Sequence, residues 1–173
     1  MEKIRFYEEA VNHFHGKRSF SALPICSVEF YAQRFNRVCE NLHDTKNLNH
    51  LANSGNWQGD IPFQEEILDK EHVVVVTDEN LNIVYATQNM RLMNGYRPQE
   101  VIGKTPKLFQ GKDTCKETSK KVSKAVKSLS PFEVVLTNYS KDGAPYKCWI
   151  KGAPVYNKSG KVVNFIAFEK KVA

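Results

Sequence analysis

Three runs with strand character close the chain and restrict its fold more than any other feature. They are PFEVVLTNY, APYKCWIKGAPVY and KVVNFIAFEKK, and the segments SKDG and NKSG separate them. Both connecting segments end in glycine, which adopts the positive φ of tight turns without steric cost. Two further runs, HVVVVTDEN and LNIVYATQ, form a predicted hairpin from His72 onward. The sequence therefore predicts five antiparallel strands in the second part of the chain.

Short helices are predicted between the hairpin and the last three strands. NMRLMNGY has helical spacing and stops at Asn94-Gly95, and RPQEVIG has proline early and glycine at its end. The run TCKETSKKVSKAVKSL places apolar residues on one side of a helix and lysines on the other. This order is typical of an α+β fold in which a five-stranded antiparallel sheet carries short helices on one face.

The first 60 residues are predicted to form a helical extension and a linker, followed by one domain over residues 61–173. Two apolar stripes at helical spacing support the extension: Ile4-Tyr7-Val11-Phe14 and, after a cap at Ser27, Val28-Tyr31-Phe35-Val38-Leu42. Residues 44–62 are rich in Asn, Gly and Asp and are interpreted as an irregular linker. Pro62 then begins a short predicted helix, PFQEEILDKE.

The net charge of +6 lies in one segment, since residues 104–127 carry eight lysines against Asp113 and Glu117. No arginine follows Arg97, and arginine is the usual reader of bases and phosphates, so we expect no nucleic-acid partner. No apolar run approaches the roughly 20 residues of a membrane span, and the first residues lack the apolar core of a signal peptide. The four cysteines are widely spaced, which favours reduced thiols in a cytoplasmic protein.

Residues 72–173 resemble a PAS domain through VVVTDENLNIVYAT, NGYRPQEVIGK, LTNYSKDGAPYKCWI and APVYNKSGKVVNFIAFEKK. Within this family, GKTPKLFQGKDT and LTNYSKDG are most similar to the flavin-binding LOV branch. LOV domains carry G-x-N-C-R-F-L-Q-G at this place, and their cysteine forms a covalent adduct with photoexcited flavin mononucleotide. Here Thr105 and Pro106 stand at the asparagine and cysteine positions, and proline has no nucleophile for that chemistry.

The resemblance also locates candidate residues for a ligand pocket: Thr105, Lys107, Gln110, Asn138, Cys148 and Glu169. Gln110 and Asn138 match the family's flavin-contacting residues. Lys107 stands for a phosphate-binding arginine, Cys148 for a ring-binding asparagine and Glu169 for a ring-binding glutamine. Because few of the family's polar contacts remain, and each unmet buried one costs roughly 1–3 kcal/mol, we expect no cofactor. Flavin binding stays open as an alternative.

Other groups of residues that could bind haem or zinc, or catalyse a reaction, are interpreted as having no such role. His72 is the only histidine in residues 61–173, which leaves no axial ligand for a haem of the kind some PAS domains bind. Cys39 and His43 have i, i+4 spacing, which we interpret as incidental rather than as a zinc site. The sequence shows no Ser/His/Asp arrangement and no phosphate-binding glycine loop. We expect neither a metal nor a catalytic residue, and no enzymatic activity.

The far face of the predicted sheet collects large apolar side chains. Four of them face away from the pocket if Asn138 and Cys148 face into it: Tyr139, Trp149, Ile166 and Phe168. Such an apolar patch needs a cover. The expected cover is helical, either from the first 43 residues of the same chain or from a second copy, with a homodimer favoured.

The predicted function is a signal-transduction PAS module that acts by protein interaction or dimerisation. It would sense at most a small apolar ligand in its core. Because the last strand lies close to the end of the sequence, the signal is expected to pass through a partner rather than through an attached output domain. The alternative is a flavin-binding, LOV-like photoreceptor or redox sensor without the adduct cysteine.

Overall fold

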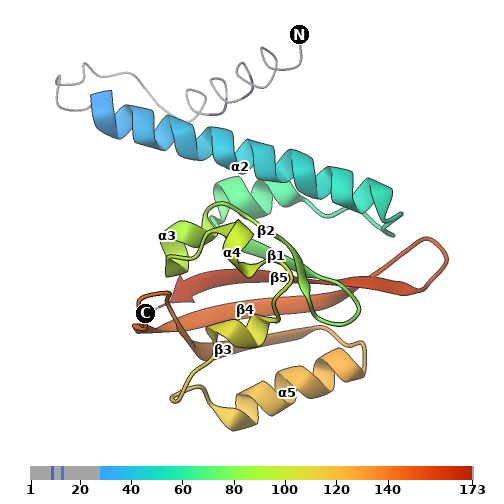
Figure 1. The fold of residues 1–173 in the computed structure, drawn as a ribbon. Helices are drawn as coiled ribbons and strands as arrows, with labels where there is room; N and C mark the ends of the chain where they lie inside the picture. The colour runs from blue at the N-terminus through green and yellow to red at the C-terminus, as the bar shows by residue number, and fades with distance from the viewer. Residues whose placement is uncertain (1–8, 10–12, 14–27, 173) are drawn as a thin grey trace.

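The computed structural model describes residues 9, 13 and 28–172 of the chain, and Figure 1 shows their arrangement. The helical elements are α2 (Val28–Ser54), the π-helical turn η2 (Glu65–Asp69), α3 (Met90–Asn94), α4 (Pro98–Val101), the 3-10 turn η3 (Pro106–Phe109) and α5 (Lys116–Lys127). The strands are β1 (Val73–Thr77), β2 (Ile83–Ala86), β3 (Phe132–Tyr139), β4 (Pro145–Tyr156) and β5 (Val162–Val172).

The five strands form one antiparallel sheet in the order β2-β1-β5-β4-β3. The first strand pairs with the last, so that Val75 lies opposite Ala167. The β4 strand pairs with β5 on one side and with β3 on the other. The predicted five-stranded α+β fold is confirmed.

One face of the sheet, called here the inner face, packs against the short helices and α5. One inner cluster joins β1 and β2 to the helical segments and consists of Val73, Val75, Ile83, Ala86, Met90, Val101 and Phe109. A second inner cluster lies on β3 and β4 and consists of Leu136, Tyr146, Cys148 and Ile150, with Val122 of α5 packed against it. Figure 1 shows α5 lying next to β3 at the end of the molecule opposite α2.

The other face, called the outer face, is covered over β1 and β5 by the chain that precedes β1. Its cluster consists of Leu48, Trp57, Phe63, Ile67, Val74, Val76, Val155 and Ile166. The Trp57 indole also donates a hydrogen bond from Nε1 to Asn164 Oδ1 on β5, at 3.0 Å. In Figure 1 η2 lies between α2 and the sheet. Residues 48–67 are therefore part of the domain core.

This arrangement corrects the prediction that residues 44–62 form an irregular linker. The α2 helix continues to Ser54, and only the stretch between α2 and η2 lacks a helix or strand. Leu48, Leu51 and Ala52 have helical spacing and all pack on the outer cluster. Tertiary packing of this stripe overrides the weak helix preference of the asparagines around it. Of the first predicted helix, only Glu9 and His13 fall within the described residues, and both are helical; its apolar stripe lies outside them.

A buried carboxylate ties α2 to the sheet. Asp44 is fully buried, and its Oδ1 accepts a hydrogen bond from the Tyr85 hydroxyl at 2.7 Å. Its Oδ2 accepts one from the main-chain N–H of Gln88 at 2.6 Å. Burial raises the pKa of Asp44 to about 6, against the opposing effect of these two hydrogen bonds. The contact connects the middle of α2 to β2 and to the loop that leads into α3.

Replacing Asp44 by alanine is expected to lower the free energy of unfolding by about 1–3 kcal/mol, because the Tyr85 hydroxyl and the Gln88 N–H would lose their buried acceptor. Chemical denaturation at pH 7.5, where the carboxyl is ionised, measures the effect. Asp60→Ala is the control, since Asp60 is exposed. Equal midpoints for the two variants would contradict an anchoring role for Asp44.

Candidate functional site

A cluster of buried polar side chains lies on the inner face of the sheet. Asn138 on β3, Cys148 on β4 and Glu169 on β5 are each no more than 3% exposed. They share this face because side chains alternate along a strand, and the apolar Leu136 and Ile150 occupy neighbouring inner positions. The structure thus brings three of the six predicted pocket residues together.

Two residues that the sequence analysis did not single out complete this cluster. Tyr146 lies opposite Asn138 in the β3–β4 register, and its hydroxyl accepts a weak hydrogen bond from Asn94 Nδ2 at 3.5 Å. Asn94 is 2% exposed and is the last residue of α3. The strand alternation around Cys148 indicates Tyr146, which lies two residues earlier on β4, whereas nothing in the local sequence marks Asn94 as buried.

The Glu169 carboxyl is the least satisfied member of the cluster. Among the residues that the structure describes, its one hydrogen-bonding partner is the Cys148 thiol, with Sγ 3.8 Å from Oε2. A thiol is a weak donor, so the carboxyl lacks the strong donors that a buried anion needs. A ligand with N–H or C=O groups at this position would supply the missing hydrogen bonds.

The electrostatics of the cluster favour neutral side chains. Burial raises the pKa of Glu169 to about 7, which the Cys148 thiol opposes only in part. Burial and then the nearby Glu169 raise the pKa of Cys148 well above its usual range. Burial and then Cys148 do the same for the pKa of Tyr146. At neutral pH the thiol and the phenol are therefore protonated, and Glu169 lies close to its titration midpoint.

The remaining predicted pocket residues lie on the segment around η3. Thr105 precedes η3 and Lys107 lies within it, and both side chains are exposed, whereas Gln110 is half-buried. Phe109 is 1% exposed and anchors this segment in the inner cluster of β1 and β2. Within residues 28–172, no hydrogen bond joins Thr105, Lys107 or Gln110 to the buried polar cluster.

A cavity opens beside the buried cluster. Its volume is about 390 Å³, and it is lined by Met93, Asn94, Gly95, Ser140, Lys141 and Asp142. Two of these residues reach the cluster, since Met93 packs on the β3–β4 residues and Asn94 contacts Tyr146. This volume lies within the range of roughly 300–1,000 Å³ that small-molecule pockets occupy.

The four predicted interaction residues do not share one surface. Ile166 is buried and Phe168 is partly buried in the outer cluster, where Leu48, Trp57, Phe63 and Ile67 cover them. The cover was expected from the first 43 residues or from a second copy, whereas among the described residues it comes from residues 48–67. The turn after α2 brings Trp57, Phe63 and Ile67 back over the sheet.

Trp149 and Tyr139 have other partners. The Trp149 ring lies 5.0 Å from the His72 ring, between centroids, and its Nε1 donates a hydrogen bond to Glu133 at 2.9 Å. Tyr139 does not join the outer cluster. Its hydroxyl donates to Asp113 Oδ2 at 2.7 Å, and its ring packs so closely on Gly111 that any side chain there would clash.

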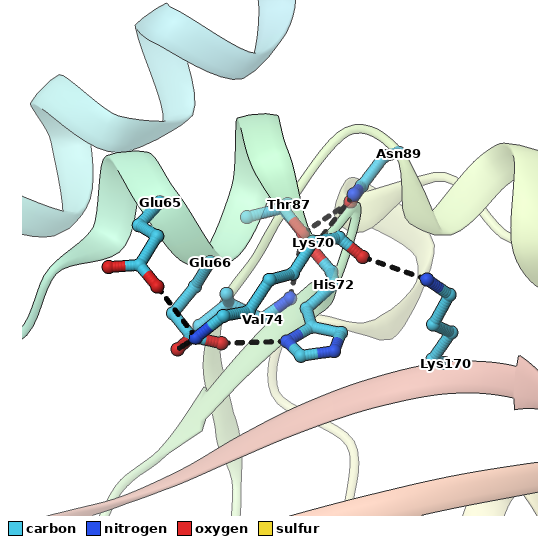
Figure 2. Close-up of polar contacts among 8 residues, drawn as sticks. All are labelled: Glu65, Glu66, Lys70, His72, Val74, Thr87, Asn89 and Lys170. Carbon is cyan, nitrogen blue, oxygen red and sulfur yellow. Dashed lines mark hydrogen bonds and ion pairs between the residues drawn. The ribbon is translucent and has the colours of Figure 1, made fainter.

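A polar network at the start of β1 was not anticipated from the sequence (Figure 2). Glu66 of η2 binds the Lys70 ammonium and the His72 ring, each at 2.7 Å. Burial opposes ionisation of Glu66, but these two hydrogen bonds together outweigh it and lower its pKa. Asn89 Nδ2 donates to the His72 carbonyl and Lys170 Nζ donates to the Lys70 carbonyl, at 2.9 and 3.0 Å. The network fixes η2 against the loop before α3 and the end of β5.

The described residues give no support for a metal site or for a membrane-spanning helix. Cys39 and His43 lie on α2, and the described residues contain no group of three or more His, Cys, Asp or Glu side chains that could hold a metal ion. None of the helices described by the structure is both long enough and apolar enough to span a bilayer.

Comparison with known proteins identifies the family that this chain resembles, independently of the geometry. The family model for the PAS domain matches residues 70–170. Phototropin-2 of Oryza sativa subsp. japonica is 37% identical over 91 residues, which are 53% of this chain and 10% of that protein. Protein TWIN LOV 1 of Arabidopsis thaliana is 32% identical over 111 residues, which are 62% of this chain and 28% of that protein. The chain thus spans less than a third of the length of these relatives.

Solved structures that resemble this chain include LOV domains. A light-oxygen-voltage domain studied with a flavin analogue is 29% identical to this chain with a TM-score of 0.61, and the match covers 66% of this chain and 87% of that domain. The LOV domain of the blue-light photoreceptor Aureochrome1, in its light state, is 27% identical with a TM-score of 0.56, covering 58% and 81% respectively.

These matches contradict the expectation that the chain takes no cofactor, because one matched structure is of a LOV domain studied with a flavin analogue and others are of blue-light photoreceptors. The expectation of no cofactor assumed that a side chain that replaces a ring-binding residue of the family can no longer contact a ligand. The structure shows that Cys148 and Glu169 remain buried and directed inward at the replaced positions. The family model covers more than half of the chain, from residue 70 to residue 170. The chain belongs to the PAS domain family, and its relatives lie in the LOV branch of that family.

Proposed function

We propose that this chain is a flavin-binding sensory PAS module that works without a cysteinyl adduct. The observation that carries the proposal is the buried cluster of Asn138, Cys148 and Glu169 on three adjacent strands, in which the Glu169 carboxyl has only the weak Cys148 thiol as a partner among the described residues. A buried carboxyl with so weak a partner is uncommon in folded proteins and calls for an explanation. The polar edge of a flavin ring supplies both donors and acceptors.

The side chains divide into two groups with respect to such a ligand. Asn138 and Glu169 would hydrogen-bond the polar edge of the ring, the carboxyl of Glu169 as a donor when it is protonated. In this proposal Lys107, which is exposed on η3, and the half-buried Gln110 that follows η3 would contact a phosphorylated tail that extends toward solvent. The flavin itself would supply absorption of visible light and reversible redox chemistry.

Pro106 separates this module from the photochemistry of its relatives. It begins η3, directly after Thr105, and it offers no thiol to an excited ring. A light or redox signal must therefore arise from a change in protonation or hydrogen bonding around the ring. Cys148 is buried and its pKa is raised by burial, so it is not an alternative nucleophile.

The module acts through interaction rather than catalysis in this proposal, with a second copy or a signalling protein as its partner. The outer face over β3 and β4 supports an interaction surface, since Val135 is 50% exposed and Trp149 is only partly buried.

The test is to measure flavin binding and light response together. The full chain, purified and then incubated with flavin mononucleotide, is expected to retain the flavin in a 1:1 ratio, seen as a visible absorption band that stays with the protein in gel filtration. Blue light in the absence of a reductant is expected to cause no bleaching of this band in the parent chain, because no cysteinyl adduct can form. Pro106→Cys is expected to gain a light-induced bleach that recovers in the dark.

Pro106→Ser is the matched control, because a hydroxyl of nearly the same size is a much weaker nucleophile than a thiol. A chain that retains no flavin would overturn the proposed function. Flavin retention without any bleach in Pro106→Cys would show that the ring lies away from η3 and would overturn its proposed placement.

A further inference from the structure

A second cavity lies between α2 and the PAS domain, on the other side of Met93 from the cavity beside Asn94. Its volume is about 240 Å³, and it brings together Arg37 and Asn41 of α2, Val73 of β1, Leu92 and Met93 of α3, and Lys171 of β5. A cavity of about 150 Å³ holds a benzene ring. This one therefore has room for an aromatic ring with one or two polar substituents.

The charge around this cavity, the α2 cleft, is positive and only partly compensated. Arg37, Lys170 and Lys171 line it, against the single carboxylate of Glu71. Lys170 uses one N–H on the Lys70 carbonyl (Figure 2), and the Lys171 ammonium lies 5.7 Å from the centre of the Tyr146 ring. Within the described residues, Arg37 forms no hydrogen bond or ion pair. An anionic group is the ligand chemistry that these side chains fit.

An independent feature indicates that the ligand also donates a hydrogen bond. Asn41 is 6% exposed, and its Oδ1 is buried without any hydrogen-bond partner. The neighbouring Thr45 hydroxyl uses the Asn41 main-chain carbonyl and leaves the side-chain oxygen unpaired. A buried acceptor without a partner is destabilising. Asn41 also lines the α2 cleft, so a rotation of its side chain would bring this inaccessible oxygen to a hydroxyl or N–H group of a ligand in the cleft.

We propose that the α2 cleft binds a small hydroxy acid with an apolar body. Its carboxylate would pair with Arg37 and Lys171, its apolar part would lie on Val73 and Met93, and its hydroxyl would donate to Asn41 Oδ1. This ligand contacts α2 and the PAS domain at once, so its binding stabilises the docked position of α2. The site is distinct from the flavin site, whose proposed contacts are Asn138 and Glu169.

The probe for this site is 4-hydroxybenzoate, titrated into the uniformly ¹⁵N-labelled full chain. The side-chain amide signal of Asn41, assigned by its loss in Asn41→Leu, is expected to shift in a saturable manner. Benzoate lacks the hydroxyl and 4-hydroxybenzyl alcohol lacks the charge. Each is expected to bind about tenfold more weakly, a difference of about 1.4 kcal/mol.

Variants on α2 distinguish binding in the cleft from non-specific attraction of the anionic probe to the positively charged surface. Arg37→Gln is expected to weaken 4-hydroxybenzoate about tenfold. Arg34→Gln, one turn earlier and outside the cleft, is expected to leave the affinity unchanged. Asn41→Leu, which lacks the side-chain signal and is followed instead through the main-chain amide signals of residues that line the cleft, is expected to abolish the preference for 4-hydroxybenzoate over benzoate. Both arginines are exposed, so neither substitution disturbs the core.

Three outcomes would overturn the proposal: no saturable shift of the Asn41 amide, equal effects of Arg37→Gln and Arg34→Gln, or equal binding of the uncharged alcohol. The same titration of flavin-loaded protein checks that the site is separate, since displacement of the flavin would place the probe in the flavin pocket instead. These results do not depend on whether the flavin proposal succeeds, because the Asn41 signal reports on the cleft with or without flavin.

Discussion

Replacing Leu48 by alanine is expected to lower the free energy of unfolding by about 2–5 kcal/mol. Leu48 is fully buried between α2 and the outer face, in the cluster that also contains Ile67 and Ile166. The substitution removes apolar contacts and leaves a cavity in the layer that joins α2 to the sheet. The lost contacts lie in a segment that the sequence alone predicts to be a linker.

Asn49→Ala is the matched control for this prediction. Asn49 is the next residue on α2 and its side chain is exposed, so its replacement is expected to change stability by less than about 0.5 kcal/mol or to raise it slightly through helix propensity. Urea denaturation followed by circular dichroism measures both variants. A Leu48→Ala protein as stable as Asn49→Ala would mean that α2 does not share the core of the PAS domain.

The sheet could be predicted from the sequence because strand alternation and turn glycines are local signals. Asn138 and Cys148 were predicted to face the helices, and both do. The long runs of β3, β4 and β5 leave little choice of register once the turns are fixed by Gly143 and Gly160, whose φ angles are positive.

The layer over the outer face could not be predicted in the same way. Residues 44–54 contain several asparagines and one buried aspartate, and their helical state depends on contacts with β2 and β5. Trp57 lies between α2 and η2 and forms only an isolated bridge to Asn157, and Phe63 begins the helical turn that leads into η2. Neither residue belongs to a long periodic run that would indicate burial. Long-range packing decides such segments, and local propensity does not.

The candidate site shows both the reach and the limit of the sequence. Three of the six predicted pocket residues, Asn138, Cys148 and Glu169, lie together in the structure. The expectation of no cofactor was wrong, because the replaced side chains were taken as evidence against any ligand. The structure shows that Cys148 and Glu169 are both buried and only weakly satisfied by each other. The network of Glu66, Lys70 and His72 was missed, although the i, i+4 spacing of Glu66 and Lys70 is visible in the sequence.

The last prediction concerns the pH dependence of stability. The pKa of Glu169 rises from 4.5 to about 7 in the folded state, mainly through burial. The unfolded chain therefore releases this proton at lower pH than the folded chain does. The resulting penalty is absent below about pH 4.5, grows as the pH rises and is complete above about pH 7, where it amounts to about 3 kcal/mol at 1.36 kcal/mol per pKa unit.

Glu169→Gln is expected to remove this part of the pH dependence. Between pH 4.5 and pH 8, the parent chain, freed of bound small molecules, should lose about 3 kcal/mol more stability than the variant. The raised pKa of Asp44 acts in the same direction, but it is present in both proteins and cancels in the comparison. Cys148 loses its contact with Glu169 in the variant, but burial alone is the largest cause of its raised pKa, so the thiol stays protonated over this pH range in both proteins.

The measurement is a series of denaturant titrations at pH values from 4.5 to 8, with Glu117→Gln as the control. Glu117 is exposed in the first turn of α5, so its replacement should leave the difference between acidic and alkaline pH as it is in the parent. If Glu169→Gln and Glu117→Gln follow the same curve as the parent, the Glu169 carboxyl ionises as it would in water. It would then have access to a stronger partner than the Cys148 thiol. In that case the main reason for assigning a polar ligand to the inner face would be lost, because the carboxyl would already be satisfied by the protein or by solvent.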